Sequence, residues 1–138
     1  SRLEDVLVDP DFVARHLGPD NTESRKLLYE DAELGFCILA HVNLGPKESK
    51  PHDHGPAWAI YGQATGETVM TDWRKMAPPN GEVPGKVEAA DIYTLSPGMA
   101  RAYGVGDLHS PSRAEETRLI RIEARNMDTV KRDAYEAV

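Results

Sequence analysis

The chain has 138 residues, of which 40% are hydrophobic and 28% are charged, and this size and balance suit one globular domain. Its formal net charge of −7 argues against nucleic acid or an anionic membrane as the main partner, because both require a basic protein face. No stretch has the roughly 20 apolar residues of a membrane-crossing helix, and the acidic start SRLEDVLVDPDF is not predicted to be a secretory signal. The single cysteine, Cys37, excludes an internal disulfide, which fits a cytoplasmic protein.

Residues 1–34 are predicted to form a helical segment that packs on a barrel formed by residues 35–138, within a single domain. Asp9 followed by Pro10 resembles an N-cap with proline in the first helical position, so a helix is expected to begin there. A second short helix is expected over residues 22–29, with two adjacent leucines as its apolar contacts.

From residue 35 onward, short apolar or alternating runs are separated by Gly, Pro, Asn or Asp. The first run, GFCILAHVNL, has β character and is followed by a Gly-Pro turn. Further runs lie near residues 57–63, 66–74, 87–95, 100–103 and 117–125. Residues 77–85 are predicted to be a surface loop, and residues 128–138 a terminal helix capped by Asp128. Many short strands at near-regular spacing predict an all-β sandwich or barrel.

Two histidines in the sequence PHDHG are candidate ligands of a metal ion. Side chains two residues apart in a strand project from the same face, so His52 and His54 can present two imidazoles to one point. Imidazole is the usual ligand of zinc, copper, iron and nickel, whereas calcium and magnesium prefer oxygen donors. An isolated His-x-His is more often a pair of solvated loop histidines, so the surrounding residues decide the interpretation.

The glycines and histidines of the chain resemble, in order and spacing, the two motifs of the cupin superfamily. The first cupin motif, Gly-x5-His-x-His-x3–4-Glu-x6-Gly, is matched, with one extra residue before the first histidine, by Gly45, His52, His54 and Gly66. The second motif, Gly-x5-Pro-x-Gly-x2-His-x3-Asn, is matched at Gly98, Gly106 and His109, with Gly104 for the proline and Arg113 for the asparagine. The resemblance covers roughly residues 35–125. It implies an all-β double-stranded β-helix barrel in which His52, His54 and His109 bind a divalent transition metal.

Position 59, where the cupin motif has a glutamate ligand, is Ala59, and residues 55–66 contain no acid. Three neutral imidazoles would leave the charge of the metal uncompensated and coordination positions open, as in a catalytic site that attracts an anionic donor. A three-histidine cupin site resembles that of the thiol dioxygenases, of which cysteine dioxygenase is the best known. In that family the substrate sulfur binds Fe(II) and O2 adds to give a sulfinic acid. The resemblance implies a non-haem iron dioxygenase that uses Fe(II), with zinc, nickel or manganese as alternatives.

The chain departs from the thiol dioxygenases at the positions where they bind cysteine. The strand TRLIRIEAR, which matches their Ser-His-Tyr strand, is expected to direct three apolar side chains inward, those of Ile120, Ile122 and Ala124. Arg121 and Glu123 are expected on its outer face. The carboxylate-binding arginine of the family lies soon after an N-terminal tyrosine, but here two acids follow Tyr29. The expected substrates are therefore O2 and a small thiol or enolisable molecule other than cysteine.

Tyr103 and Arg101 lie on the strand that leads to His109 and are candidate catalytic residues. Tyr103 would act as an acid or hydrogen-bond donor near the metal, and the alternative is an aromatic residue of the barrel wall. Arg101 would bind a substrate carboxylate, and the alternative is an exposed arginine. Trp58 is expected at the cavity mouth or in the core, and His41 is expected to be a hydrogen-bonded core or rim histidine.

Two other functions stay open at this stage. A zinc, manganese or nickel cupin isomerase, lyase or hydrolase would use its ion as a Lewis acid, although such sites usually keep the carboxylate ligand that Ala59 replaces. A non-catalytic metal-binding sensor module would need a partner domain. A homodimer also stays open, because exposed strand edges have to be covered.

Overall fold

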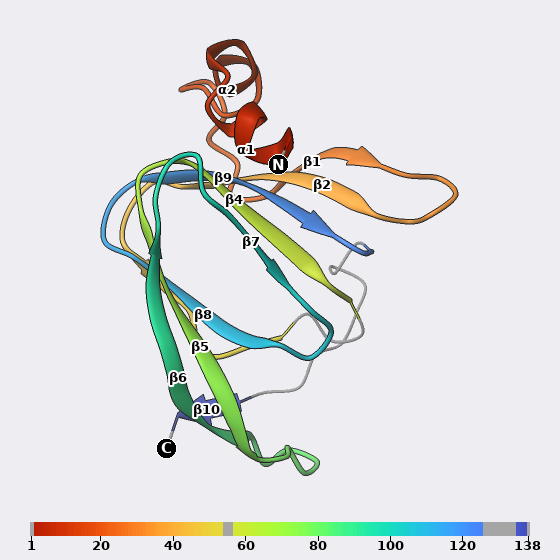
Figure 1. Ribbon diagram of the computed structural model, residues 1–138, viewed down its shortest axis with the longest axis vertical. Coiled ribbons are helices and arrows are strands. Elements are labelled where there is room, and N and C mark those ends of the chain that lie inside the picture. Colours follow the sequence, from red (N-terminus) through yellow and green to blue (C-terminus); the bar gives the residue numbers. More distant parts are fainter. Residues whose placement is uncertain (1, 54–56, 126–134, 138) are drawn as a thin grey trace.

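The computed structural model of the chain describes residues 2–53, 57–125 and 135–137 (Figure 1). Ten strands in these ranges form two five-stranded sheets. The first sheet has the order β1-β2-β9-β4-β7, with the bounds Lys26–Glu30, Cys37–Asn43, Thr117–Glu123, Ala59–Thr65 and Ala100–Tyr103. The second sheet has the order β10-β6-β5-β8-β3, with the bounds Tyr135–Ala137, Gly85–Leu95, Thr68–Ala77, Leu108–Arg113 and Lys47–Glu48. Neighbouring strands are antiparallel, apart from the parallel pair β10 and β6.

The short runs predicted as strands are strands in the structure, and the all-β prediction is confirmed. The predicted strand 100–103 has the same bounds as β7, and the predicted loop 77–85 falls at the connection between β5 and β6. β8 was not predicted, because Pro111 and two serines obscure its pattern. The carbonyl of Pro111 nonetheless accepts a hydrogen bond of 3.0 Å from the backbone N–H of Ser49.

The first sheet is covered on one face by two helices, α1 (Arg2–Leu7) and α2 (Pro10–His16), which lie on the side away from the second sheet (Figure 1). The predicted N-cap is confirmed, since the Asp9 carboxylate accepts a hydrogen bond of 3.0 Å from the backbone N–H of Asp11. Gly62 of β4 permits close approach, because a Cβ there would lie 2.8 Å from Cδ1 of Leu7. Four fully buried side chains form this contact, those of Leu7, Leu17, Ala40 and Ile120. Neither helix is long and apolar enough to cross a membrane.

Alternate residues of β9 face the helices and the second sheet, and the predicted assignment of its two faces is wrong. Ile120 and Ile122 pack with the helices on the outer face of the first sheet. Arg121 and Glu123 therefore lie on the inner face, where the guanidinium of Arg121 lies over the ring of Tyr61. The apolar face of the strand is used to bind the helices, so polar side chains face the barrel interior.

The predicted helix over residues 22–29 is wrong, and the predicted terminal helix is wrong over residues 135–137, the part of it that the structure describes. Residues 26–30 form strand β1, which pairs with β2 through partners such as Leu27 and Leu39. The backbone hydrogen bonds of this hairpin outweigh the helical tendency of the two leucines, which is a weak preference. Most of the predicted terminal helix lies outside the described residues, but residues 135–137 form strand β10 beside β6. The division of the chain at residue 34 stays a prediction, and β1, which precedes it, is part of the first sheet.

The space between the two sheets contains both apolar and polar side chains. One buried apolar cluster there comprises Ala59, Tyr61, Met70, Leu95 and Tyr103. Buried polar side chains are also numerous, and they include those of Gln63, Thr68, His109, Arg113 and Glu123. Buried polar groups are costly unless they are paired, so a polar interior indicates a site where function has outweighed stability.

Candidate metal centre and the adjoining cavity

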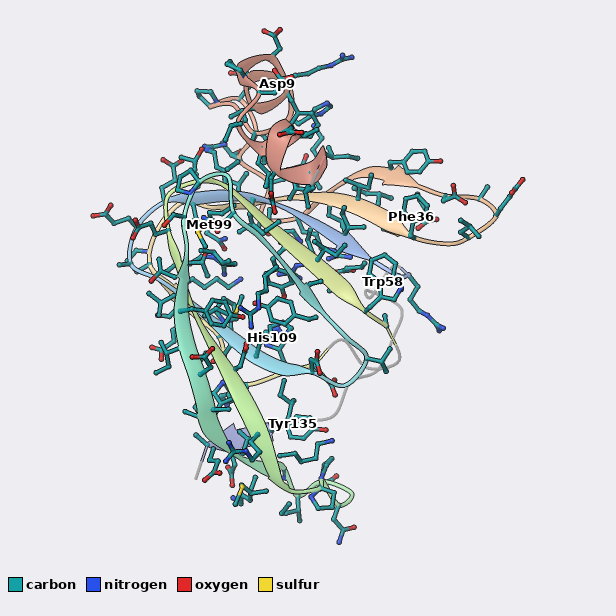
Figure 2. All side chains as sticks on the ribbon, in the orientation of Figure 1. Asp9, Phe36, Trp58, Met99, His109 and Tyr135 are labelled. Atoms are coloured by element: carbon teal, nitrogen blue, oxygen red, sulfur yellow. The ribbon has the colours of Figure 1, made fainter. Side chains whose placement is uncertain are left out.

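His52 and His109 lie side by side, which the sequence predicted from the two motifs. Each backbone N–H donates to the carbonyl of the other residue, at 3.0 Å from His52 and 2.9 Å from His109. The centroids of the two imidazoles are 4.8 Å apart. His109 is fully buried, and Figure 2 shows it between the two sheets. The two backbone hydrogen bonds form an antiparallel β-bridge between β8 and the segment before β4. This bridge brings together two histidines that are 57 positions apart in the sequence (109 − 52).

The ring of His52 is oriented by a hydrogen bond to its own loop. Its Nδ1 lies 2.9 Å from the carbonyl oxygen of Lys50, which can only accept a hydrogen bond. Nδ1 therefore carries a proton, and in the neutral imidazole the lone pair is on Nε2. Metal-binding histidines commonly donate their second ring N–H to a carbonyl in this way, which fixes the tautomer and the ring orientation. The protonation of His52 fits a metal ligand.

His109 is enclosed by two tyrosine rings. Its Nε2 lies 3.1 Å from the hydroxyl of Tyr61, and the ring of Tyr103 packs against it with centroids 4.2 Å apart. Tyr61 lies on β4 two residues after Ala59, so both side chains point into the barrel. The aromatic rings shield this imidazole from water, and the Tyr61 hydroxyl lies within hydrogen-bond distance of its Nε2.

His54, the third predicted ligand, lies outside the described residues. The three-histidine set therefore stays a prediction. Within the part of the chain that the structure describes, no group of three or more His, Cys, Asp or Glu side chains is placed to hold a metal ion. His52 and His109 supply two nitrogen donors, and a divalent transition metal would take its third from His54.

An acid does lie beside position 59, although on another strand. Ala59 is paired with Glu123 of β9, and both residues are fully buried. The Glu123 carboxylate is bound by two guanidinium groups, that of Arg25 at 3.3 Å and that of Arg121 at 3.4 Å. These arginines neutralise the carboxylate that comes closest in register to the cupin glutamate.

Tyr103 packs against His109, and both Tyr103 and Arg101 line a second cavity. The ring of Tyr103 contacts His109, but its hydroxyl hydrogen-bonds to Tyr93, which in turn donates to Asp72. Burial and the Tyr93 hydrogen bond raise the pKa of Tyr103 above its ordinary value, so its hydroxyl stays protonated. Arg101 has a side chain 45% exposed and forms an ion pair of 3.3 Å with Asp72. A catalytic role of either residue stays a prediction.

His52 also lines a cavity of about 580 Å³ that opens beside it. Three of its other lining side chains were not predicted for the site, those of His41, Arg113 and Arg121. His41, expected as a hydrogen-bonded core or rim histidine, lines this cavity, and its Nε2 has no hydrogen-bond partner among the described residues. Burial and the nearby Arg121 lower the pKa of His41 to about 2, so this imidazole is neutral. The sequence held one signal, since Arg113 replaces the asparagine of the second motif.

Trp58 is 40% exposed and lies beside the end of the first sheet (Figure 2). Its carbonyl accepts a hydrogen bond of 3.1 Å from the N–H of Ala124, which ties the entry of β4 to the end of β9. The exposure excludes the core alternative for this side chain.

No protein-family model matches the chain, and no curated protein matches it in sequence. Solved structures do match it. An uncharacterised protein with a double-stranded β-helix domain from Klebsiella pneumoniae has a TM-score of 0.59 at 16% identity, over 90% of this chain and 88% of that one. KdgF from Halomonas sp. has a TM-score of 0.57 at 16% identity, over 80% of this chain and 88% of that one.

A cupin superfamily protein from Desulfitobacterium hafniense has a TM-score of 0.54 at 11% identity, over 74% of this chain and 76% of that one. These similarities confirm the predicted fold, the double-stranded β-helix of the cupin proteins. The likeness is one of fold alone, so the resemblance to the thiol dioxygenase branch stays a prediction.

Proposed function

We propose that this protein is a metal-dependent enzyme, a non-haem iron dioxygenase with its ion held by His52, His54 and His109. Its substrates would be O2 and a small thiol or enolisable molecule other than cysteine. The observation that carries the proposal is the pairing of His52 and His109, with their ring centroids 4.8 Å apart and Nδ1 of His52 turned to a carbonyl. Two buried or partly buried imidazoles in this arrangement are typical of a transition-metal site.

The absence of a carboxylate ligand from the described part of the site supports oxygen chemistry. Ala59 supplies no donor, and the carboxylate of Glu123 is engaged by Arg25 and Arg121. Iron, when bound, supplies one-electron chemistry towards O2 and Lewis acidity towards an anionic substrate atom. For a thiol the overall reaction is R–SH + O2 → R–SO2H, in which both oxygen atoms enter the product and no external reductant is needed.

The residues of this chain would position the substrate and exclude water. Tyr61 and Tyr103 enclose His109 with their rings, so that the ligand nitrogen lies in a weakly hydrated environment. The Tyr61 hydroxyl, 3.1 Å from Nε2 of His109, can donate a hydrogen bond to an atom bound near that nitrogen. Electrostatic interactions are stronger in such an environment than in water.

The alternative is an isomerase, lyase or hydrolase that uses zinc, manganese or nickel. One observation favours it, because the Tyr61 hydroxyl lies 3.1 Å from Nε2 of His109 and is an oxygen that could serve as a fourth ligand. A closed four-ligand site would leave less room for O2.

Metal analysis and oxygen uptake of the purified protein test the proposal. We expect bound iron and consumption of O2 with members of a panel of thiols and diketones. His52→Ala, His54→Ala and His109→Ala are each expected to abolish metal retention, and His41→Ala serves as the control that retains it. Circular dichroism verifies that each variant folds. Stoichiometric zinc without O2 uptake would exclude the dioxygenase, and full metal retention in His109→Ala would refute the ligand set.

A further inference from the structure

We propose that the cavity beside His52 binds the carboxylate group of a small organic anion between Arg113 and Arg121. The identification of this anion as the substrate rests on the proposed function, but the binding itself does not. The cavity is lined by residues of β2, β3, β8, β9 and β10 and by the loop that carries His52. Its volume of about 580 Å³ lies in the range of small-molecule sites.

Arg113 is a buried cation without a counter-ion in the described structure. The residue is only 5% exposed to solvent. Its Nε donates a hydrogen bond of 3.1 Å to the hydroxyl of Thr68. None of the ion pairs within the described residues includes Arg113. Burial, together with the nearby Arg121, lowers its pKa to about 10. Proteins rarely bury a charge in this way without a partner, so an anion is the expected occupant.

Arg121 faces the same cavity from β9, which belongs to the other sheet. Its guanidinium lies 4.4 Å from the ring centroid of Tyr61, and its Nη1 lies 3.4 Å from Glu123. Its Nε is buried and has no hydrogen-bond partner among the described residues. Because nearly all buried N–H groups in proteins are hydrogen-bonded, this donor also indicates a missing acceptor.

The charge around the cavity is opposite to that of the whole chain. Four of the described lining residues are Lys or Arg, namely Lys47, Lys50, Arg113 and Arg121, and none of the described lining residues is Asp or Glu. The chain as a whole has a net charge of −7. A cavity with one sign of charge concentrates ligands of the opposite sign. The neutral His41 adds a hydrogen-bonding nitrogen without adding charge.

A carboxylate fits the two arginines better than other small anions. The guanidinium is planar and presents parallel N–H donors that match the two oxygens of a carboxylate. An anion held there would extend its remaining atoms towards His52, which lines the same cavity. The ring of Tyr61 contacts both Arg121 and His109, so it separates the anion site from the candidate metal ligand. The substrate class is then a small carboxylic acid that bears the reacting thiol or enolisable carbon.

Calorimetry with succinate tests the proposal, with its neutral diamide, succinamide, as the matched ligand control. The full chain is used as purified and again after metal removal. We expect succinate but not succinamide to bind, and Arg113→Met and Arg121→Met each to weaken binding by about tenfold or more. Arg74→Met is the matched control protein, because Arg74 is an exposed arginine of β5 that pairs with Glu88 of β6 and does not line the cavity. Its affinity for succinate is expected to equal that of the unmodified chain.

A stability measurement guards against the case in which a variant fails to fold. Since Arg113 is buried without a counter-ion, Arg113→Met is expected to unfold at the same urea concentration as the unmodified chain or at a higher one. Equal binding of succinate and succinamide would overturn the proposal, as would unchanged affinity in a folded Arg113→Met variant. Binding of inorganic phosphate but not of succinate would overturn the choice of a carboxylate. Succinate binding retained in metal-free His109→Ala would support the anion site even if the proposed dioxygenase were wrong.

Discussion

The ion pairs of Glu123 and Glu116 separate the effect of burial from the effect of distance. Glu123 is fully buried and lies 3.3 Å from Arg25 and 3.4 Å from Arg121. Glu116 lies closer to its partner, 2.7 Å from Arg118, but its side chain is 49% exposed. Replacement of each by glutamine removes one negative charge and nearly preserves side-chain volume. If burial has more effect on the strength of an ion pair than distance has, the loss of the Glu123 charge should destabilise the protein more than the loss of the Glu116 charge.

Removal of the Glu123 charge takes a buried counter-ion away from two guanidinium groups, those of Arg25 and Arg121. Loss of one partner from a fully buried pair costs about 3–5 kcal/mol. The side chains of Arg25 and Arg121 are 23% and 15% exposed, so water offsets part of this loss. We therefore expect Glu123→Gln to lower the free energy of unfolding by about 2–4 kcal/mol. Glu116 is itself half exposed, and its buried partner Arg118 keeps three hydrogen bonds to backbone carbonyls, so Glu116→Gln should lower it by at most about 1 kcal/mol.

Urea unfolding of the two variants and the unmodified chain, followed by far-UV circular dichroism at neutral pH, measures both quantities. All three proteins are compared without metal, so that ligand binding does not contribute to the stability. Equal losses in the two variants, or a larger loss for Glu116→Gln, would refute the argument that burial decides the value of these ion pairs.

Two further predictions concern pH and backbone geometry. The pKa of His41 is lowered to about 2 from its ordinary 6.5, so below about pH 6.5 the unfolded chain binds a proton that the folded protein does not. Stability should then fall with decreasing pH by up to about 1.4 kcal/mol per pH unit from this group, and metal-free His41→Gln should lose that part of the slope in urea titrations between about pH 6.5 and 4.5. An identical slope in both proteins would contradict it. Gly66 has φ +74°, a backbone conformation that disfavours other residues, and a Cβ there would lie 2.4 Å from the carbonyl oxygen of Glu116. Gly66→Ala should therefore lower the free energy of unfolding by about 2 kcal/mol or more. Gly81→Ala, with φ +60° and no atom within 4 Å of the added Cβ, should lose only about 1 kcal/mol, and equal losses would show that the clash is relieved.

Local patterns in the sequence were sufficient for most of the strands and for part of the site. The alternating runs predicted β4, β5, β6, β7 and β9, and Asp9 with Pro10 predicted the start of α2. Glycine and histidine spacing predicted that His52 and His109 meet, because motif spacing reflects strand and turn lengths that the barrel requires. Residues 26–30 and 135–137 were not predicted as strands, since their hydrogen-bond partners lie on other segments.

The direction of the side chains on β9 shows what only tertiary structure decided. The strand has one apolar face and one polar face, and period-two alternation is equally compatible with either face pointing inward. The helices α1 and α2 cover the apolar face, so Arg121 and Glu123 enter the barrel. The same packing places Glu123 opposite Ala59, an acid that no inspection of the sequence around position 59 could reveal.

The sequence by itself determined the β-rich fold and the histidine pair, because both depend on residues close together in the chain or on motif spacing. The cavity of Arg113 and Arg121 required the assembled barrel, because its walls come from strands that are distant in sequence. Only in the assembled barrel is Arg113 buried, and only there do both arginines face the same cavity. None of the described residues that line this cavity is an Asp or Glu.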